Sequence, residues 1–211
     1  GSDTTAWHML HRLRKGMVNE TRSPLSGLIE ADESTIGGPA KGKRGRGVTA
    51  AKHKSLVIGA VEVIVYENKQ GTRCERAGRL RLSTVDNAGA VNIRDFLARN
   101  VEAGSTVRTD GWPGYSDEAL VGYTHRVRVV RTPERAHQVA PHVHRVFSNL
   151  KAWLNGTHHG VEPRYLQRYL DEFVFRFNRR NTPMAAFQTL LGISTQKAPL
   201  PLRDLVVLSQ P

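Results

Sequence analysis

The sequence predicts an α/β domain built on a mixed five-stranded sheet flanked by helices. Three strand-like segments follow one another in the first half of the chain, joined by turns, and two further strands are each reached through a helical stretch. Strands joined by turns pair antiparallel, whereas a strand reached through a crossover joins parallel to its neighbour. The pattern therefore combines an antiparallel meander with parallel strands, and the simplest sheet places the fourth strand beside the first.

The first elements follow from their hydrophobic patterns. A helix is expected over residues 3–20, because its apolar residues recur at helical spacing and leave a basic opposite face; they are Trp7, Leu10, Leu13 and Met17. The first strand is expected at 26–38, where an apolar run ends in a Gly-Gly turn. The second, at 55–67, is rich in Val and Ile, and the third, at 78–85, alternates like a half-buried strand.

The second half alternates between helix and strand before it becomes helical. An amphipathic stretch predicts a helix over 87–101, and β-branched runs predict the last two strands at 105–110 and 124–130. A short helix is expected between these strands, at 116–123. From Pro141 onward the apolar spacing predicts helices at 142–156, 163–180 and 183–192.

We expect three parts: an N-terminal helical arm (1–25), the α/β domain (26–192) and an irregular, proline-punctuated tail (193–211). Gly1-Ser2 is typical of a cloning scar, so we expect the natural protein to extend upstream. No segment has the ~18 uninterrupted apolar residues of a membrane span, and the N-terminus lacks the pattern of a signal peptide. A cytoplasmic protein is expected.

The charge balance points to a polyanionic partner. The 211 residues include 31 Lys and Arg against 19 Asp and Glu, a formal net charge of +12. Nucleic acid is the commonest polyanion, and an anionic membrane surface is the competitor. The Gly-rich loop 38–47 would contact DNA backbone without reading sequence, or is simply a solvated hairpin tip; its basic residues are Lys41, Lys43, Arg44 and Arg46.

Zinc is not expected. Cys74 is the only cysteine, which excludes an intrachain disulfide and a cysteine-based zinc site. Five histidines cluster in sequence, but their spacing matches no compact ligand pattern; they are His137, His142, His144, His158 and His159.

Two acids fall at the ends of neighbouring predicted strands. Asp32 ends the first strand, in "IEADEST", and Asp110 ends the fourth, in "VRTDGWPGY". Adjacent carboxylates repel one another unless a cation binds between them, and a hard divalent ion with oxygen ligands is the usual solution. In a basic protein this predicts metal-dependent phosphoryl transfer. For each acid alone, a turn-forming or solvated strand-end residue is the alternative.

A third ligand is expected from the helix at 142–156. Its apolar stripe is at helical spacing, and at ~100° per residue His144 and Lys151 lie within roughly 20° of each other on one flank. Asn149 lies on the opposite flank and is a poorer candidate.

Four motifs together resemble the catalytic domain of a bacterial insertion-sequence transposase, of the DDE-type ISXO2-like group related to eukaryotic Merlin elements. They are "GLIEADESTIGG", "VRTDGWPGY", "FSNLKAWLNGTHHGV" and "YLQRYLDEFVFRFNRR". The resemblance, from about Trp7 to about Gly192, implies an RNase H-like fold and DNA strand transfer with Mg²⁺ or Mn²⁺. It makes Asp32 and Asp110 the first two ligands. His144 becomes the third, because the family's acid lies seven residues before a helix Lys, here Lys151.

The third position departs from the family, in which most members have Glu. Imidazole is a weaker Mg²⁺ ligand than carboxylate and suits Mn²⁺ better. We expect an active site with a His ligand, with Glu172 as the alternative third ligand, although Glu172 is expected to pair with an Arg. Relatives tend to begin with a zinc ribbon and a DNA-binding segment, so recognition of the transposon ends is expected upstream of this sequence.

The other candidate residues each have to be weighed between a role in DNA binding and a structural role. Trp112 stacks on an unpaired base near the cut or packs on its own turn. Lys151 holds a DNA phosphate or is an ordinary solvated lysine. Glu33 points to the other face of the sheet. Three arginines lie at the end of the helix expected at 163–180, where they contact DNA or stabilise the helix dipole; they are Arg176, Arg179 and Arg180.

The sequence thus predicts a bacterial, nucleoid-associated DNA transposase core that acts on double-stranded DNA, without a membrane, as a homodimer or higher assembly. Two alternatives stay open. One is a catalytically impaired DNA-binding relative, whose affinity would depend on salt but not on divalent metal. The other is an RNase H-like metal nuclease, which would cut DNA without joining it.

Overall fold

The computed structural model describes residues 2–37, 54–127, 139–198 and 201. The chain divides into two compact units, Ser23–Gly160 and the pair of segments Gly1–Arg22 and Val161–Pro211. The first unit contains the whole sheet with helices α3 and α4, and the second contains helices α1, α5 and α6. The predicted limits of arm, domain and tail stay predictions.

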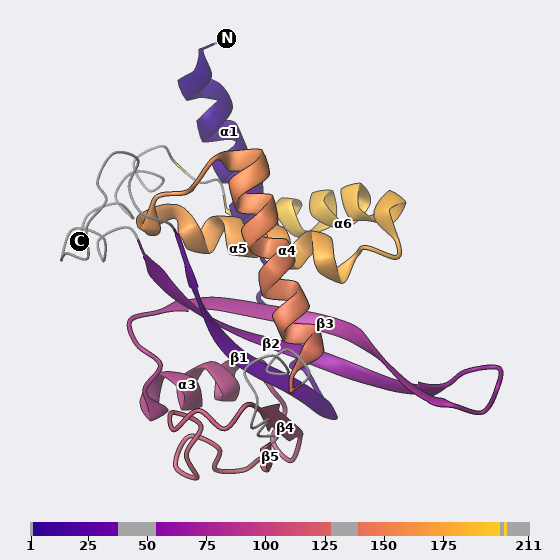
Figure 1. The fold of residues 1–211 in the computed structure, drawn as a ribbon. Coiled ribbons are helices and arrows are strands. Elements are labelled where there is room, and N and C mark those ends of the chain that lie inside the picture. Colours follow the sequence, from indigo (N-terminus) through magenta and orange to yellow (C-terminus); the bar gives the residue numbers. More distant parts are fainter. Residues whose placement is uncertain (1, 38–53, 128–138, 199–200, 202–211) are drawn as a thin grey trace. The chain divides into compact units, whose positions relative to one another are not determined.

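The sheet has five strands in the order β3-β2-β1-β4-β5 (Figure 1). β1 pairs antiparallel with β2 and β2 with β3, whereas β4 lies parallel to β1 and β5 parallel to β4. This confirms the antiparallel meander with added parallel strands, the place of the fourth strand beside the first, and the RNase H-like fold. The strands are β1 (Leu28–Ile36), β2 (Ser55–Glu67), β3 (Arg73–Val85), β4 (Thr106–Thr109) and β5 (Thr124–Val127).

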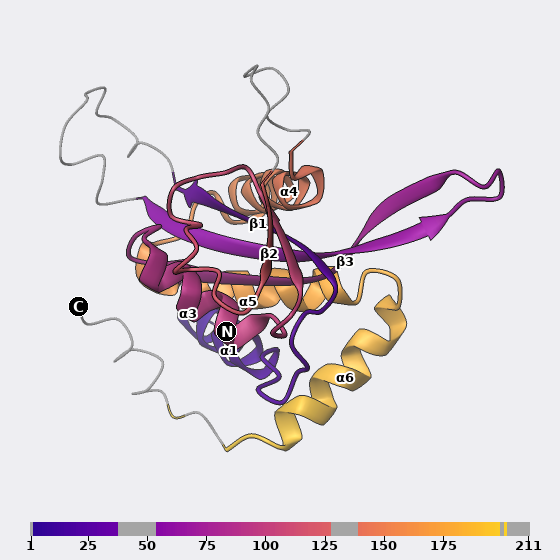
Figure 2. The ribbon, with the colours of Figure 1, turned by 90° about the horizontal axis from the view of Figure 1, so that it is seen from below.

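Two predicted elements differ from the structure. β3 begins at Arg73 rather than at residue 78, and it forms with β2 a long hairpin that projects beyond the rest of the sheet (Figures 1 and 2). The helix predicted at 116–123 is a series of turns. Eight residues make a marginal helix by themselves, and the segment ends at Gly122, whose φ is +87°. Residues 128–130 of the predicted fifth strand lie outside the described residues.

Helices α3 (Ala90–Asn100) and α4 (Pro141–His158) lie on opposite faces of the sheet (Figure 2). The side chains of α3 join a hydrophobic core with alternate residues of β1, including Ile29 and Ala31. The other face of β1 therefore points to α4. The predicted apolar stripe of α4 is confirmed, since its buried residues include Val143, Val146, Phe147, Leu150 and Leu154.

Gly59 lets α4 approach the sheet closely. It pairs with Asp32 across β1 and β2. A Cβ atom at this position would lie 2.9 Å from Cζ of Phe147, closer than real Cβ contacts allow. The absent side chain thus makes room for an α4 aromatic ring beside Asp32.

The second unit contains α1 (Asp3–Gly16), α5 (Pro163–Asn178) and α6 (Pro183–Thr195). All three were predicted as helices, but the buried face of α1 was predicted wrongly. His11 is fully buried and Arg14 is 4% exposed, whereas Leu10 and Leu13 are about half exposed. Aromatic and ionic contacts with α5 decide this face, because Arg14 Nε donates to Glu172 Oε2 over 2.8 Å.

The region predicted as an irregular tail begins inside a helix, because α6 continues to Thr195. Most of the tail lies outside the described residues. Among the helices that are described, none is both long and apolar enough to span a membrane.

Candidate active site

The parallel pairing of β1 with β4 brings Asp32 and Asp110 together. The register pairs Glu30 with Arg108, two residues before Asp32 and Asp110, and Asp110 directly follows the last residue of β4. Asp32 is 8% exposed. Burial, and then the neighbouring charge of Asp110, raises the pKa of Asp32 to about 7. The two predicted acids therefore interact in the folded chain. The prediction that Asp32 ends the first strand is wrong, because β1 continues to Ile36.

Glu33 adds a third acid next to Asp32, on the opposite face of β1. Burial, followed by the charges of Asp32 and Asp110, raises the pKa of Glu33 to about 7. Its carboxyl group lies against Tyr115, which is buried in the core on the α3 side. Negative charge thus accumulates around the middle of β1 and the end of β4, a setting that favours a bound cation.

Helix α4 adds His144 and Lys151 to the acids. Nδ1 of His144 lies 3.5 Å from Oδ2 of Asp32, and the imidazole is about one-third exposed. Lys151 is exposed two turns later on α4, and its positive charge lowers the pKa of Asp32, in opposition to the larger effects of burial and Asp110. The structure therefore brings all four predicted catalytic residues into one region of the larger unit.

A tight turn holds Asp110 at the end of β4. Its Oδ1 accepts the backbone N–H of Trp112 over 3.0 Å, as an acid that starts a turn does. Trp112 itself is half exposed. A Cβ atom at Gly114 would overlap the carbonyl oxygen of Ala88, so the turn requires glycine there. The turn interpretation and the ligand interpretation of Asp110 are thus compatible, because one oxygen serves the turn.

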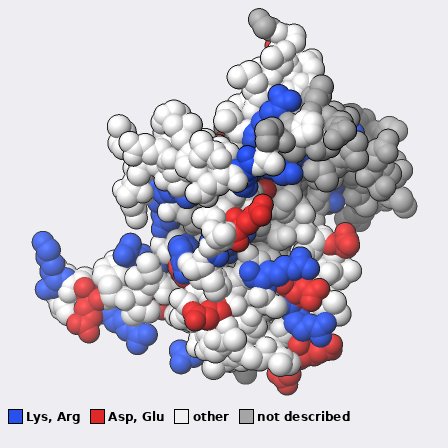
Figure 3. All heavy atoms as spheres, turned by 180° about the vertical axis from the view of Figure 1, so that it is seen from behind, with Lys and Arg blue, Asp and Glu red and all other residues white. Residues whose placement is uncertain are grey.

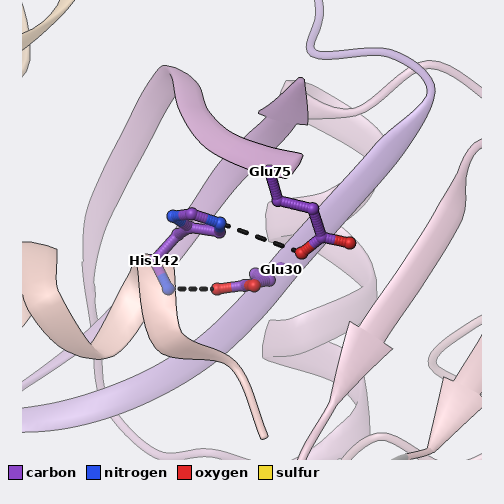
Figure 4. Close-up of side chains that lie close together, drawn as sticks. All are labelled: Glu30, Glu75 and His142. Atoms are coloured by element: carbon purple, nitrogen blue, oxygen red, sulfur yellow. Dashed lines mark hydrogen bonds and ion pairs between the residues drawn. The ribbon is translucent and has the colours of Figure 1, made fainter. Parts of the chain in front are cut away.

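A second acidic group lies next to this one (Figure 4). Glu30, Glu75 and His142 offer ligand atoms that all lie within 4.8 Å of one another and could hold a metal ion. Asp32, Asp110 and His144 do not form such a group among the described residues. The guanidinium of Arg108 already lies between the two carboxylates, 2.6 Å from Glu30 and 2.8 Å from Glu75.

Sequence reasoning missed this second group, although a signal existed. Glu30 is an acid inside the apolar run "GLIEAD", and a buried charge requires a partner. Strand alternation places it on the same face as Asp32. Its partner Arg108 follows from the parallel β1–β4 register, which the sequence does not specify.

Other predicted residues lie elsewhere or outside the described part. The basic loop residues Lys41, Lys43, Arg44 and Arg46 are not described. Glu172 forms ion pairs with Arg14 and Arg176. The sequence predicted such a pairing with an arginine. The other two arginines predicted near the end of α5 lie over aromatic rings, Arg179 over Phe175 and Arg180 over Phe177.

The projecting β2–β3 hairpin contains charges of both signs. Figure 3 shows basic and acidic side chains along it, and the exposed residues include Glu67, Lys69 and Arg73. This hairpin is therefore not a uniformly basic surface.

Comparison with known protein families identifies the family of the chain. Residues 24–178, well over half of the sequence, match the ISXO2-like transposase domain. The chain belongs to this transposase family. The matched segment includes β1 through α5 and thus every acid discussed above. The predicted resemblance is confirmed.

Other comparisons add less. No curated protein sequence matches this transposase domain. Among solved structures, it is similar to chains of "Crystal structure of a pre-cleavage Mos1 transpososome" (12% identity, TM-score 0.38, 92% of this chain) and "Mos1 transposase paired-end complex with left transposon end" (13%, 0.33, 88%). The transposase domain spans 64% and 62% of those two chains, respectively.

Proposed function

We propose that this domain is the catalytic core of a DNA transposase that cuts transposon ends and joins them to target DNA with the help of a divalent metal. The observation that supports the proposal best is the surroundings of Asp32, whose carboxylate lies 3.5 Å from the His144 imidazole and interacts with the charge of Asp110. Membership of a transposase family gives this arrangement its chemical context. The basic excess of the chain, +12 in formal charge, suits a DNA substrate.

The residues around Asp32 fit a divalent cation. Asp32 and Asp110 offer hard carboxylate oxygens. Burial and the charge of Asp110 raise the pKa of Asp32, and a bound cation would oppose both effects. The 3.5 Å between Asp32 Oδ2 and His144 Nδ1 lets one ion contact both atoms, since such bonds are about 2.0–2.2 Å long. Asp32, Asp110 and His144 would hold the ion. When bound, it supplies Lewis-acid stabilisation of charge on the reacting phosphate oxygens.

The identity of the third ligand favours Mn²⁺ over Mg²⁺ in our proposal. Imidazole nitrogen binds Mn²⁺ more readily than Mg²⁺, which prefers oxygen ligands and retains water. We therefore propose that the domain works with either ion and performs better with Mn²⁺.

The chain's own residues would orient the DNA. Lys151 is exposed on α4 near Asp32, where its ammonium group would bind a phosphate next to the cut. Trp112 is half exposed one turn from Asp110, where its indole would stack on an unpaired base. The basic residues Lys41, Lys43, Arg44 and Arg46 would contact the phosphate backbone. Each of these roles is a proposal.

The proposed chemistry is two in-line displacements at phosphorus. In the first, a water oxygen bonds to phosphorus while the bond to the 3′ oxygen of the transposon end breaks, and that oxygen takes up a proton. In the second, the new 3′-hydroxyl loses its proton and attacks a target phosphate, whose bond to its own 3′ oxygen breaks, and that oxygen takes up a proton. No covalent protein intermediate is required. We further propose that a dimer or higher assembly pairs the two ends.

The test is a cleavage and joining assay with the full-length natural protein. The substrate is the DNA that flanks its gene on both sides, and the target is a supercoiled plasmid, with Mg²⁺, Mn²⁺ or EDTA. Variants Asp110→Ala and His144→Ala remove predicted ligands, and Asn149→Ala is the matched control on the other flank of α4.

We expect metal-dependent cleavage and joining that both ligand variants lose and the control keeps. Cleavage without any joined product would favour a metal nuclease. Binding of the flanking DNA without cleavage in either metal would contradict the catalytic proposal and favour a DNA-binding relative.

A further inference from the structure

The N-terminus of α4 rests on a buried acid of β1. Oε2 of Glu30 accepts the backbone N–H groups of His142 over 2.7 Å and Val143 over 2.9 Å. These are among the first N–H groups of the helix, which have no partner inside it. The residue before the helix, Ala140, makes no side-chain cap, so Glu30 fulfils that role from another element.

Glu30 is itself held from the other side. It is fully buried, and its Oε1 accepts a hydrogen bond from Arg108 over 2.6 Å. The same guanidinium donates to Glu75 on β3 over 2.8 Å. A buried carboxylate with a charged donor and two helix N–H groups is fully compensated, which fixes its position.

This arrangement also explains why the group in Figure 4 is poorly suited to a metal. Glu30 uses Oε2 for two backbone N–H groups and Oε1 for Arg108. A metal ion would have to displace the guanidinium. The positive charge that balances Glu30 and Glu75 is therefore the guanidinium of Arg108.

The anchor and the candidate metal site are linked by sequence spacing. Glu30 precedes Asp32 by two residues on the same face of β1, and His142 precedes His144 by two residues on α4. Glu30 thus holds the first turn of α4 next to the point where His144 meets Asp32 over 3.5 Å. A shift of this turn would move His144 away from Asp32.

We propose that Glu30 is a positioning residue for the metal site: its carboxylate, clamped by Arg108, holds the first turn of α4 so that His144 faces Asp32. The proposal rests on the proposed function in so far as His144 is a metal ligand. The anchoring of α4 can be tested without metal.

The experiment compares Glu30→Leu, which removes the acceptor, with Glu30→Gln, which keeps one oxygen for the helix but loses the charge. Glu62→Leu is the matched control. Glu62 also bonds an arginine, Arg79, and a backbone N–H, that of Ser26, but neither partner belongs to α4. His144→Ala and the double variant with Glu30→Leu complete a double-mutant cycle.

Two measurements are made on each protein. Hydrogen exchange of the metal-free protein reports protection of the His142 and Val143 amides. Calorimetric titration with Mn²⁺ alone reports metal affinity. We expect faster exchange of these amides and about 10–100-fold weaker Mn²⁺ binding in Glu30→Leu. Glu30→Gln is expected to lie between Glu30→Leu and wild type, and Glu62→Leu to match wild type in both measurements.

The double variant separates positioning from general damage. If Glu30 acts through His144, Glu30→Leu weakens Mn²⁺ binding no further in the His144→Ala background. An equal loss in both backgrounds would overturn the proposal, as would unchanged exchange and unchanged affinity in Glu30→Leu. Should Glu30→Leu not fold, the same comparisons are made with Glu30→Gln.

Failure of the proposed function gives a different result. If wild type binds no Mn²⁺, the metal site is wrong, and the anchor is judged by hydrogen exchange alone. Lost protection of the two amides in Glu30→Leu then supports the anchor, and retained protection overturns it.

Discussion

Nδ1 of His144 on α4 lies 3.5 Å from Oδ2 of Asp32 on β1. The two residues are more than 100 positions apart in sequence, and each belongs to a different layer of the larger unit. Gly59, which pairs with Asp32 across the sheet, leaves room for α4 to come this close. The contact joins a carboxylate to the residue that the sequence resemblance predicts as the third ligand.

Replacement of His144 should change the choice of metal. His144→Glu restores an oxygen ligand, so we expect Mg²⁺-supported DNA cleavage to rise relative to Mn²⁺-supported cleavage. His144→Ala should lower cleavage with either ion by roughly 100-fold or more, since even indirect supports of metal ligands matter 10–100-fold. The ratio of initial rates in the two metals measures this. An unchanged ratio in His144→Glu would argue against direct ligation.

Removal of the Lys151 charge should weaken DNA binding uniformly across sequences. If Lys151 contacts one phosphate, Lys151→Met should reduce the slope of log affinity against log salt by about 1. Fluorescence anisotropy of labelled duplexes at several salt concentrations measures the slope. Lys69→Met is the matched control, because Lys69 is exposed at the far end of the β2–β3 hairpin. Equal slopes for Lys151→Met and wild type would remove Lys151 from the DNA interface.

The turn after Asp110 should not tolerate a side chain at Gly114. In Gly114→Ala the new Cβ overlaps the Ala88 carbonyl oxygen and crowds Ile93. We expect a loss of about 1–3 kcal/mol in the free energy of unfolding, typical of overpacking. Gly156→Ala is the control, because its helical site on α4 has free space and should gain about 0.5–1 kcal/mol. Denaturant titration compares them, and equal stability of the two variants would contradict the packing argument.

The smaller unit should lose stability in mild acid through His11. This imidazole is buried among aromatic rings of α1 and α5, and burial, with the charges of Arg14, Arg168 and His8, lowers its pKa to about 4. His11 is therefore protonated below about pH 6.5 in the unfolded chain but only below about pH 4 in the folded chain. Stability from this group is complete above pH 6.5 and falls by up to about 3 kcal/mol as the pH drops to 4.

His11→Phe should make the stability of the smaller unit less dependent on pH between 4 and 6.5, because phenylalanine retains an aromatic ring and cannot be protonated. His8→Gln, on the same helix, is the control and should keep nearly the whole pH dependence, because the charge of His8 is the smallest of the causes that lower the pKa of His11. Thermal unfolding between pH 4 and 7 tests this. The same fall in Tm for His11→Phe as for wild type would exclude His11 as the cause.

Local patterns were sufficient for much of the fold. The apolar stripe of α4 and the Val- and Ile-rich run of β2 predicted their elements closely, because burial and periodicity agree there. Even the β1–β4 contact followed from crossover geometry. Asp110 could be found in this way, since it directly follows β4. Asp32 was also predicted at a strand end, but it lies in the middle of β1.

Long-range polar contacts could not be predicted from local patterns. His11 and Arg14 are buried in α1 because residues of α5 pack against His11 and pair with Arg14, whereas hydrophobic spacing in α1 predicts burial of Leu10 and Leu13 instead. Glu30 was visible as an acid in an apolar strand, but its partners come from α4 and from β4. Only the tertiary register shows that these partners meet.

The most direct test of the central claim is anomalous diffraction from crystals of the protein soaked in Mn²⁺. The account predicts a manganese peak bound by Asp32, Asp110 and His144, with Arg108 still between Glu30 and Glu75. A peak bound instead by Glu30, Glu75 and His142, or full Mn²⁺ occupancy at Asp32 without His144 as a ligand, would contradict it.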